Sequence, residues 1–231
     1  MVTSVPSRPW VTYALIAANC AVFLAGPAAG PVAGTGTGTA QMEQEAYFHR
    51  WGVVPVDLLA NERAGSVLTA MFVHGSWLHL LGNALFLHVF GARLEGRLGH
   101  LHFAVFYLAA GTAATYGYAL GHADSRHALI GASGAIAGVL GAYLCLYPRA
   151  RVTSLVPALF FLPLRFPAWL VLGVWFALQW LALRAEPPGP GIAHLAHVAG
   201  FAAGFAYAWA RYRRADTLGG AARANRGDSQ P

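Results

Sequence analysis

The residues best suited to chemistry in this sequence are a few polar side chains that lie inside apolar stretches. They are Ser133 in LIGASGAIAGVLGAY, His79 and Asn83 in HGSWLHLLGN, and His194 and His197 in HLAHVAGFAAG. A serine hydroxyl becomes a strong nucleophile when a neighbouring base accepts its proton, and histidine is the most common base. An amide or a second imidazole can donate hydrogen bonds to the oxyanion that such an attack creates. These residue types could therefore form a serine-histidine site for acyl transfer.

Each of these residues also has a plainer interpretation. A serine among glycines and alanines often only fills space or bonds back to its own helix. A histidine within a membrane span is often held by a nearby hydroxyl or carbonyl and takes no part in chemistry. Convergence of several polar residues at one depth would favour chemistry, so the elements that carry them must be placed first.

The elements follow from the apolar composition of the chain. Of its 231 residues, 57% are hydrophobic and 10% are charged, and the mean hydropathy is +0.49. These values are typical of an integral membrane protein. Six apolar stretches are each close to the ~17 to 25 residues that cross the hydrocarbon core as a helix; they are residues 11–29, 77–95, 101–121, 129–147, 167–184 and 192–211. The sequence thus predicts an all-α polytopic membrane protein with six transmembrane helices.

The six stretches define one membrane domain over residues 11–212. Residues 1–10 precede it on the cytoplasmic side, and residues 213–231 are expected to be a disordered cytoplasmic tail. A long outer loop, about residues 30–76, is expected to form short amphipathic helices at the membrane surface. The first stretch could instead be a signal peptide, but the arginine pattern fits six spans, so we expect this stretch to be retained.

The basic residues predict the orientation of these helices. All fifteen are arginines, and cytoplasmic loops of membrane proteins carry an excess of basic residues. If both termini are cytoplasmic, eleven arginines fall on the inner side and four on the outer side, namely Arg50, Arg63, Arg126 and Arg184. The net charge of +6 is then explained by topology and by anionic lipid, without nucleic-acid binding.

In this topology the polar residues lie at one depth. The spans that carry them all run from the outer to the inner side, and each polar residue falls within the first two turns, roughly 3 to 10 Å below the outer helix end. All nine acidic residues lie in loops, tails or span ends. The sequence therefore predicts no carboxylate inside the membrane. This argues against a proton-coupled transporter and against a protease of the aspartic type, because both need buried carboxylates.

Small residues predict which helices approach each other. Gly134 and Gly138 are four apart in the fourth stretch, and Gly200 and Gly204 are four apart in the sixth. Such spacing lets two helix backbones come close. This packing would bring the hydroxyl of Ser133 toward the imidazole of the sixth stretch.

Three motifs resemble those of the rhomboid family of intramembrane serine proteases. HGSWLHLLGN at 74–83 is similar to the family's second-helix His-x-x-x-Asn with a further histidine before it. GASG at 131–134 resembles the Gly-x-Ser-Gly of the nucleophile helix, and AHVAGFAAG at 196–204 resembles the sixth-helix His-x-x-Gly-x-x-x-Gly. EGRLG at 95–99 is similar to the junction after the second helix. The resemblance covers about residues 10–212 and implies a six-transmembrane-helix rhomboid-like bundle.

The resemblance implies a role for each matching residue. Ser133 would be the nucleophile and His197 the general base, in a dyad without a carboxylate. His79, Asn83 and the backbone N–H of Ser133 would hold the oxyanion. No metal or cofactor is implied. The supporting residues would be His74, Gly131, Gly134, Gly200 and Gly204.

The sequence departs from the family pattern at two places. Many rhomboids carry an aromatic residue four positions after the serine, where it stacks on the catalytic histidine, but this chain has Ala137 there. We expect another group to steer the imidazole, either Tyr143 or a residue of the sixth helix. Some members also carry Trp-Arg in the first outer loop, where this chain has Gly65 and Ser66, so the anchoring of that loop needs another explanation.

The resemblance implies transmembrane proteins as substrates, cleaved in or beside their membrane segments. The arginine-only, alanine-rich and glycine-rich composition suggests a bacterial plasma membrane, with the site opening to the outer face. One alternative is a rhomboid-like pseudoprotease that binds membrane clients without cleaving them. A second is a bundle in which histidines ligate haem or a metal, namely His74, His79, His194 and His197.

Overall fold

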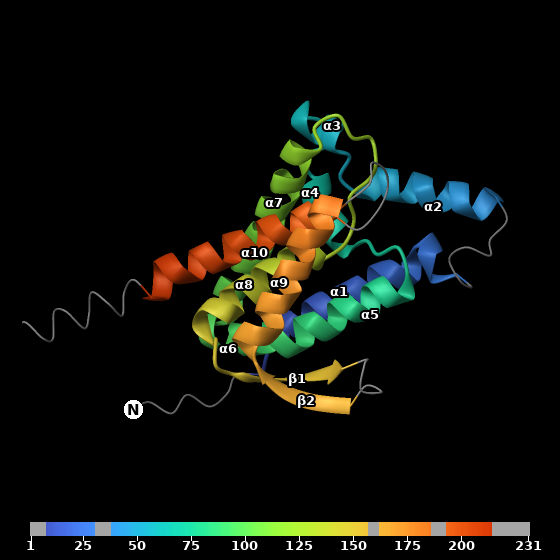
Figure 1. Ribbon diagram of the computed structural model, residues 1–231. Coiled ribbons are helices and arrows are strands. Elements are labelled where there is room, and N and C mark those ends of the chain that lie inside the picture. Colours follow the sequence, from blue (N-terminus) through green and yellow to red (C-terminus); the bar gives the residue numbers. More distant parts are fainter. Residues whose placement is uncertain (1–7, 31–37, 157–161, 186–192, 214–231) are drawn as a thin grey trace, which may run out of the picture.

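The body of the protein is a bundle of helices (Figure 1). The computed structural model describes residues 8–30, 38–156, 162–185 and 193–213, so the expected tail beyond residue 213 lies outside the described residues. The main helices are α1 Trp10–Ala25, α5 Trp77–Phe86, α6 Ala92–Leu98, α7 His100–Gly121, α8 Ser133–Leu146, α9 Ala168–Ala185 and α10 His194–Ala208. A π-helical turn, Leu87–Gly91, joins α5 to α6, and a second, Trp209–Arg213, extends α10. Each of the six apolar stretches therefore contains a helix.

Helix length and hydropathy identify fewer than six spans within the described residues. Helices α7 and α9 are long and apolar enough to cross a membrane by themselves. A third span results if Ser66–Phe72 and Trp77–Leu98, which meet at 95°, are counted together, while α1 and α8 are apolar but shorter. The structure thus shows a mostly helical protein, and the six-span arrangement stays a prediction.

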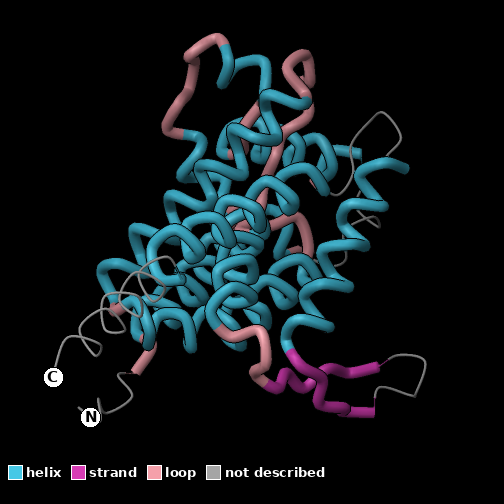
Figure 2. Tube along the Cα trace, turned by 60° about the vertical axis from the view of Figure 1, so that its left-hand side comes forward, coloured by secondary structure: helices cyan, strands magenta, loops and turns pink. Residues whose placement is uncertain are grey.

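A β-hairpin connects α8 to α9, and the sequence analysis missed it. Strand β1, Arg151–Val156, pairs antiparallel with β2, Leu162–Pro167, so that Arg151 lies opposite Pro167 (Figure 2). The two prolines of LPLRFP hide the strand pattern in the sequence. They are compatible with pairing here because both strands of a two-stranded sheet are edge strands. Buried Val152 packs the hairpin against the helical body.

The segment between α1 and α5 contains the short helices that were expected in it. They are α2 Gly38–Trp51, α3 Pro55–Leu59 and α4 Ser66–Thr69, followed by a 3₁₀ turn at Ala70–Phe72. Helix α2 has no buried residue and projects from the bundle (Figure 1).

Hydrogen bonds anchor this segment without the Trp-Arg pair. The hydroxyl of Thr69 donates to the carbonyl of Trp51 at 2.7 Å. Val53 and Leu129 exchange backbone hydrogen bonds of 2.9 and 2.7 Å, and the N–H of Gly131 donates to the carbonyl of Ala70 at 2.8 Å. These bonds tie the residues just before α8 to the preceding segment, and they fix where α8 begins.

Helices α7, α8 and α10 form the centre of the bundle. Helix α8 is buried along most of its length, from Ala135 to Cys145. Its far end packs in a core of large side chains drawn from α6, α7 and α9, among them Leu94, Phe103, Tyr107 and Leu172. Helix α9 lies at the edge, with only Ala168 and Leu172 buried.

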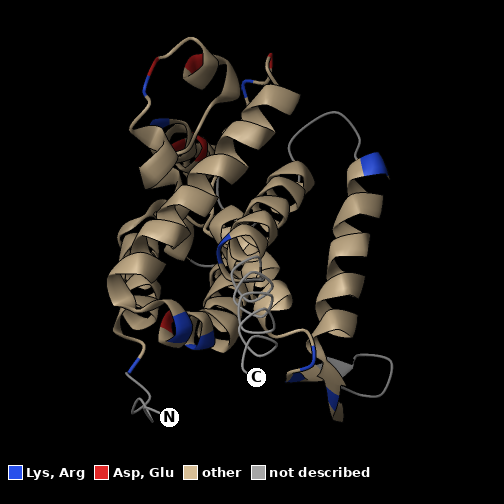
Figure 3. Ribbon diagram, turned by 90° about the vertical axis from the view of Figure 1, so that its left-hand side faces the viewer, with Lys and Arg blue, Asp and Glu red and all other residues tan. Residues whose placement is uncertain are grey.

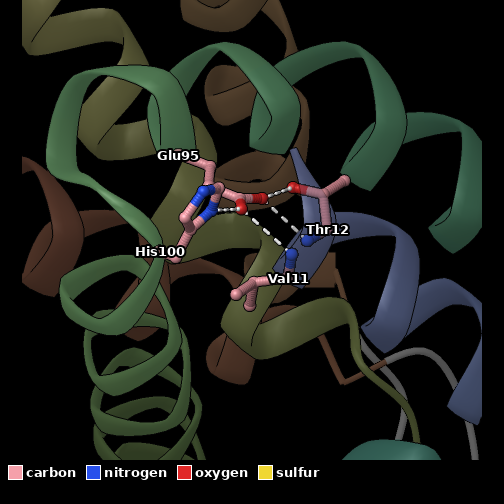
Figure 4. A network of polar contacts seen from close by, with 4 residues as sticks. All are labelled: Val11, Thr12, Glu95 and His100. Carbon is pink, nitrogen blue, oxygen red and sulfur yellow. Dashed lines mark hydrogen bonds and ion pairs between the residues drawn. The ribbon is translucent and has the colours of Figure 1, made fainter. Parts of the chain in front are cut away.

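A buried carboxylate ties α6 to the start of α1 (Figure 4). Glu95 is fully buried, and its side chain accepts hydrogen bonds from the N–H groups of Val11 and Thr12 at 2.9 and 2.8 Å. It also accepts from the Thr12 hydroxyl at 2.7 Å and from Nδ1 of His100 at 2.5 Å. The first N–H groups of a helix lack partners within it, and α1 has no side-chain cap of its own. Glu95 therefore caps α1 from another helix, and its negative charge suits the positive end of the helix dipole.

Charged side chains are unevenly distributed between the two ends of the bundle (Figure 3). Arginines gather at the end that holds the hairpin and the described N-terminal residues, while acidic side chains gather at the opposite end. Glu95 is an exception, because it lies between Arg93 and Arg97 on α6. Some arginines also lie among the acidic side chains at the opposite end (Figure 3). This asymmetry agrees with the arginine count on which the predicted topology depends.

Candidate active site

Two helix ends bring the predicted nucleophile and base together. Ser133 is the first residue of α8, and His197 lies in the first turn of α10. The hydroxyl of Ser133 donates a hydrogen bond of 2.8 Å to Nε2 of His197. This is the contact through which a histidine can remove the proton of a serine.

Backbone contact between α8 and α10 sets this distance. A Cβ atom placed on Gly200 would overlap the carbonyl oxygen of Gly134, and one placed on Gly204 would overlap the carbonyl oxygen of Gly138. The helices can therefore approach this closely only because both positions lack side chains. The glycine stripes singled out in the sequence lie face to face in the structure.

The other ring nitrogen of His197 is held by a residue that sequence reasoning missed. Nδ1 of His197 donates to Oε1 of Gln179, on α9, at 2.7 Å. The same oxygen lies 3.0 Å from Nδ1 of His194. The ring of Trp175, one turn earlier on α9, lies 6.0 Å from the His197 ring between centroids.

The expectation that Tyr143 steers the imidazole is therefore wrong, whereas a residue of the sixth helix, His194, shares the Gln179 oxygen, and its ring lies 6.2 Å from that of His197 between centroids. Tyr143 lies deeper on α8, where its ring packs against Phe90 and Tyr147. The other contacts of the imidazole, from Gln179 and Trp175, come from the fifth apolar stretch. A sequence signal existed, because Gln179 is the one uncharged polar side chain in AWLVLGVWFALQWLALRA, but periodicity does not show which neighbour such an amide faces.

The predicted oxyanion residues line the same cavity as Ser133. His79 and Asn83 project from α5 into it. Asn83 is only 8% exposed, and its Nδ2 donor has no hydrogen-bond partner. A buried amide without a partner is unusual in a folded protein and points to a ligand group that would accept from it.

The sharp turn before Ser133 places it beside His79. Gly131 has φ +113°, a conformation that residues with side chains rarely adopt, and a Cβ there would lie 2.7 Å from the His79 ring. His79 is itself placed by the start of α5, where its N–H donates to the Ser76 hydroxyl at 3.2 Å. The absence of a side chain at Gly131 lets the imidazole lie against the turn that leads into the serine.

His74 lies behind this ring and does not line the cavity. It is 2% exposed, its Nδ1 donates to the carbonyl of Phe72 at 3.1 Å, and its ring lies 5.0 Å from that of His79 between centroids. Its contacts support the position of His79. Within the described residues no three histidine, cysteine or acidic side chains are grouped to hold a metal ion.

The cavity beside Ser133 has a volume of about 690 Å³. Helices α5, α8 and α9, the loop before α8 and the start of α10 contribute to its wall. Its polar groups, including Ser133, His197 and Asn83, are joined by an apolar lining that includes Phe86, Ile136, Ala137, Leu140 and Trp175. Such a cavity can hold an apolar ligand beside the few polar groups of its wall.

Comparison with known protein families identifies the chain. The model of the rhomboid domain matches residues 61–214, more than half of the sequence. The chain belongs to the rhomboid family. The matched segment contains every residue of the site, Gln179 included, and rhomboids are integral membrane proteins, which agrees with the apolar composition.

Three related rhomboid proteins are similar over parts of the chain. "Rhomboid protein 1, mitochondrial" of Saccharomyces cerevisiae is 31% identical over 160 residues, 67% of this chain and 38% of its own length. "Putative rhomboid protease YdcA" of Bacillus subtilis is 34% identical over 87 residues, 37% of this chain and 43% of its own. "RHOMBOID-like protein 5" of Arabidopsis thaliana is 28% identical over 97 residues, 42% of this chain and 31% of its own. The chain thus matches less than half the length of each of these relatives.

Proposed function

We propose that this rhomboid protein is an intramembrane serine endopeptidase that cleaves other membrane proteins in or beside their transmembrane segments. The observation that carries the proposal is the 2.8 Å hydrogen bond between Ser133 Oγ and His197 Nε2 at the wall of the apolar cavity. The unpartnered amide of Asn83 in the same cavity supports it. The name of the similar Bacillus subtilis protein, which includes the words rhomboid protease, is consistent with it.

In the proposed mechanism Ser133 attacks the carbonyl carbon of the scissile peptide bond while His197 takes its proton. The resulting oxyanion accepts hydrogen bonds from Asn83, His79 and the backbone N–H of Ser133, which is free for this because the first N–H groups of a helix have no partner within it. His197 then protonates the leaving amine, and the C–N bond breaks to leave an acyl-enzyme. Water, activated by His197, hydrolyses the ester and restores the serine.

The proposal places six membrane spans in the order α1, α5 with α6, α7, α8, α9 and α10. The arginine-rich hairpin end would face the cytoplasm of a bacterium together with both termini. Ser133, at the start of α8, would then lie toward the outer face, where water can enter. Spans as short as α1 and α8 would need local thinning of the bilayer or the shelter of neighbouring helices.

The substrate must expose a peptide bond that a helix normally protects. Backbone groups of a membrane helix are hydrogen-bonded within it, so the scissile bond becomes accessible only where the helix unwinds. Glycine or proline weakens a helix by ~1 to 3 kcal/mol per residue. We therefore expect substrates with such residues near the cut, and a small residue at the cut itself.

Covalent labelling of the solubilised protein with a fluorophosphonate tests this proposal. The parent is compared with Ser133→Ala and His197→Ala, and with Ser154→Ala and His88→Ala, whose side chains lie outside the cavity. Labelling should disappear in the first pair and remain in the second. Absence of labelling in folded parent would favour the pseudoprotease alternative, and haem absorbance or stoichiometric metal in the purified protein would favour the ligand-binding one.

A further inference from the structure

Gln179 is the feature of the site that the dyad mechanism does not use. It lies on α9, a helix whose remaining side chains are almost all apolar and which has only two buried residues. Its carbonyl oxygen nevertheless accepts from Nδ1 of His197 at 2.7 Å, on the ring edge opposite the serine. A polar side chain in a membrane-facing helix is costly unless it has a partner, and its usual reason is function.

The contact decides which tautomer of the imidazole is present. A neutral imidazole carries one proton, on either Nδ1 or Nε2, and the hydrogen bond of one nitrogen sets the state of the other. With the proton on Nδ1, donated to Gln179, Nε2 is left as an acceptor for the hydroxyl of Ser133. With the proton on Nε2, the same ring could not remove the proton of the serine.

His194 shares the amide oxygen of Gln179 with His197. A side-chain amide offers an acceptor oxygen at one end and donor N–H groups at the other. The oxygen accepts from Nδ1 of both His194 and His197, at 3.0 and 2.7 Å. With the oxygen on this side, Nδ1 of both imidazoles must carry the proton, whereas a turned amide would donate to both nitrogens and require the opposite tautomers. The two arrangements therefore predict different protonation states of His197, which NMR can distinguish.

We propose that Gln179 is a positioning residue that holds His197 in the tautomer that accepts the Ser133 proton. Serine, histidine and glutamine then form a hydrogen-bonded chain in which the amide oxygen only accepts. This inference rests on the proposed function. An amide oxygen accepts from Nδ1–H without the desolvation cost of a charge, a cost that a carboxylate at this position would offset only through its two imidazole partners.

The test compares Gln179→Met with Leu178→Met. Methionine keeps an unbranched side chain of similar length at position 179 and removes the amide oxygen. Leu178, the adjacent residue, is 58% exposed and does not line the cavity, so the same replacement there controls for the new side chain on α9. A third variant, Gln179→Glu, restores an acceptor at the same place.

Two quantities are measured on each variant in detergent. The first is the second-order rate of Ser133 labelling by the fluorophosphonate. The second is the ¹⁵N NMR shift of the two ring nitrogens of His197, which separates protonated from unprotonated nitrogen and is assigned by comparison with His197→Ala. A thermal melt of each variant confirms that the protein is folded.

Gln179→Met should label roughly 10- to 100-fold more slowly, a part of the ~10² to 10⁴ that a positioned general base provides. Its His197 should lose the fixed Nδ1–H state, whereas Leu178→Met should match the parent in both measurements and Gln179→Glu should recover both. Two results would overturn this inference: an unchanged tautomer and labelling rate in folded Gln179→Met, or a folded Gln179→Glu that labels as slowly as Gln179→Met. If the parent is labelled in the same experiment, the proposed function stands in either case. Unlabelled parent would refute the proposed function, and the NMR shifts would still decide the tautomer.

Discussion

Replacing Gly200 with alanine should separate Ser133 from His197 without changing either residue. The Cβ of Gly200→Ala would overlap the carbonyl oxygen of Gly134 and lie 3.2 Å from the Cβ of Ala114, whereas ordinary Cβ contacts are 3.4–4 Å. Backbone atoms on α8 cannot yield as a flexible side chain would, so α10 must move away from α8 by about 1 Å. His197 lies three residues from Gly200 on the same helix, and its Nε2 moves with it.

This movement would lengthen the 2.8 Å contact between Ser133 and His197 beyond hydrogen-bond range. A misplacement of ~1 Å can cost ~10²-fold in rate, so labelling of Ser133 should slow by about that factor. The overpacking costs ~1 to 3 kcal/mol, and the better helix propensity of alanine returns ~1 kcal/mol of it, so the fold should survive.

The assay measures the labelling rate and the melting temperature of the same preparation. Gly173→Ala is the matched control, because a Cβ at Gly173 on α9 meets nothing within 4 Å. It should label at the parent rate. A Gly200→Ala protein that also labels at the parent rate would show that the α8–α10 contact does not set the distance between serine and histidine.

Three further changes test other parts of the structure. Glu95→Gln replaces one acceptor oxygen with donor N–H groups that face existing donors, and breaking this buried charge network should cost ~3 to 5 kcal/mol. At ~2 to 4 °C per kcal/mol, the melting temperature should fall by ~6 to 20 °C. A fall no larger than that of exposed Glu43→Gln would contradict the capping role. Asn83→Ala should slow Ser133 labelling by ~10² to 10³-fold. Stability should change little, because Nδ2 of Asn83 has no hydrogen-bond partner to lose. An equal labelling rate would contradict a role of Asn83 in binding the oxyanion. Thr69→Val removes the hydroxyl that donates to the carbonyl of Trp51, a loss of ~1 kcal/mol. Limited proteolysis between α2 and α4 should therefore become faster. Unchanged proteolysis would show that the backbone bridge at Val53 is enough to anchor this segment.

The sequence allowed most of the helices and the central pair of residues to be anticipated. The apolar stretches marked the helices because burial in lipid or protein requires long apolar runs. Glycines spaced four apart marked the faces of α8 and α10 that meet, and the structure brings Ser133 and His197 to hydrogen-bond distance at that contact. Their catalytic roles remain a proposal.

The features that were missed depend on contacts between distant segments. Gln179 is visible in the sequence as a lone amide, but its partner on α10 depends on how α9 packs against that helix. The hairpin is concealed by Pro163 and Pro167, whose penalty in a strand vanishes at an edge. Glu95 was recognised only as an acid at the end of a stretch, and nothing local predicts that it caps α1 across more than eighty residues.

The most direct test of the central claim is cleavage of a model membrane protein in proteoliposomes. The substrate carries one transmembrane helix with a glycine or proline near a small residue at its outer end, and its fragments are identified by mass spectrometry. The parent should cut this helix at one site, and Ser133→Ala, reconstituted to the same density, should leave it whole. Equal cleavage by Ser133→Ala would show that the serine hydrogen-bonded to His197 is not the nucleophile.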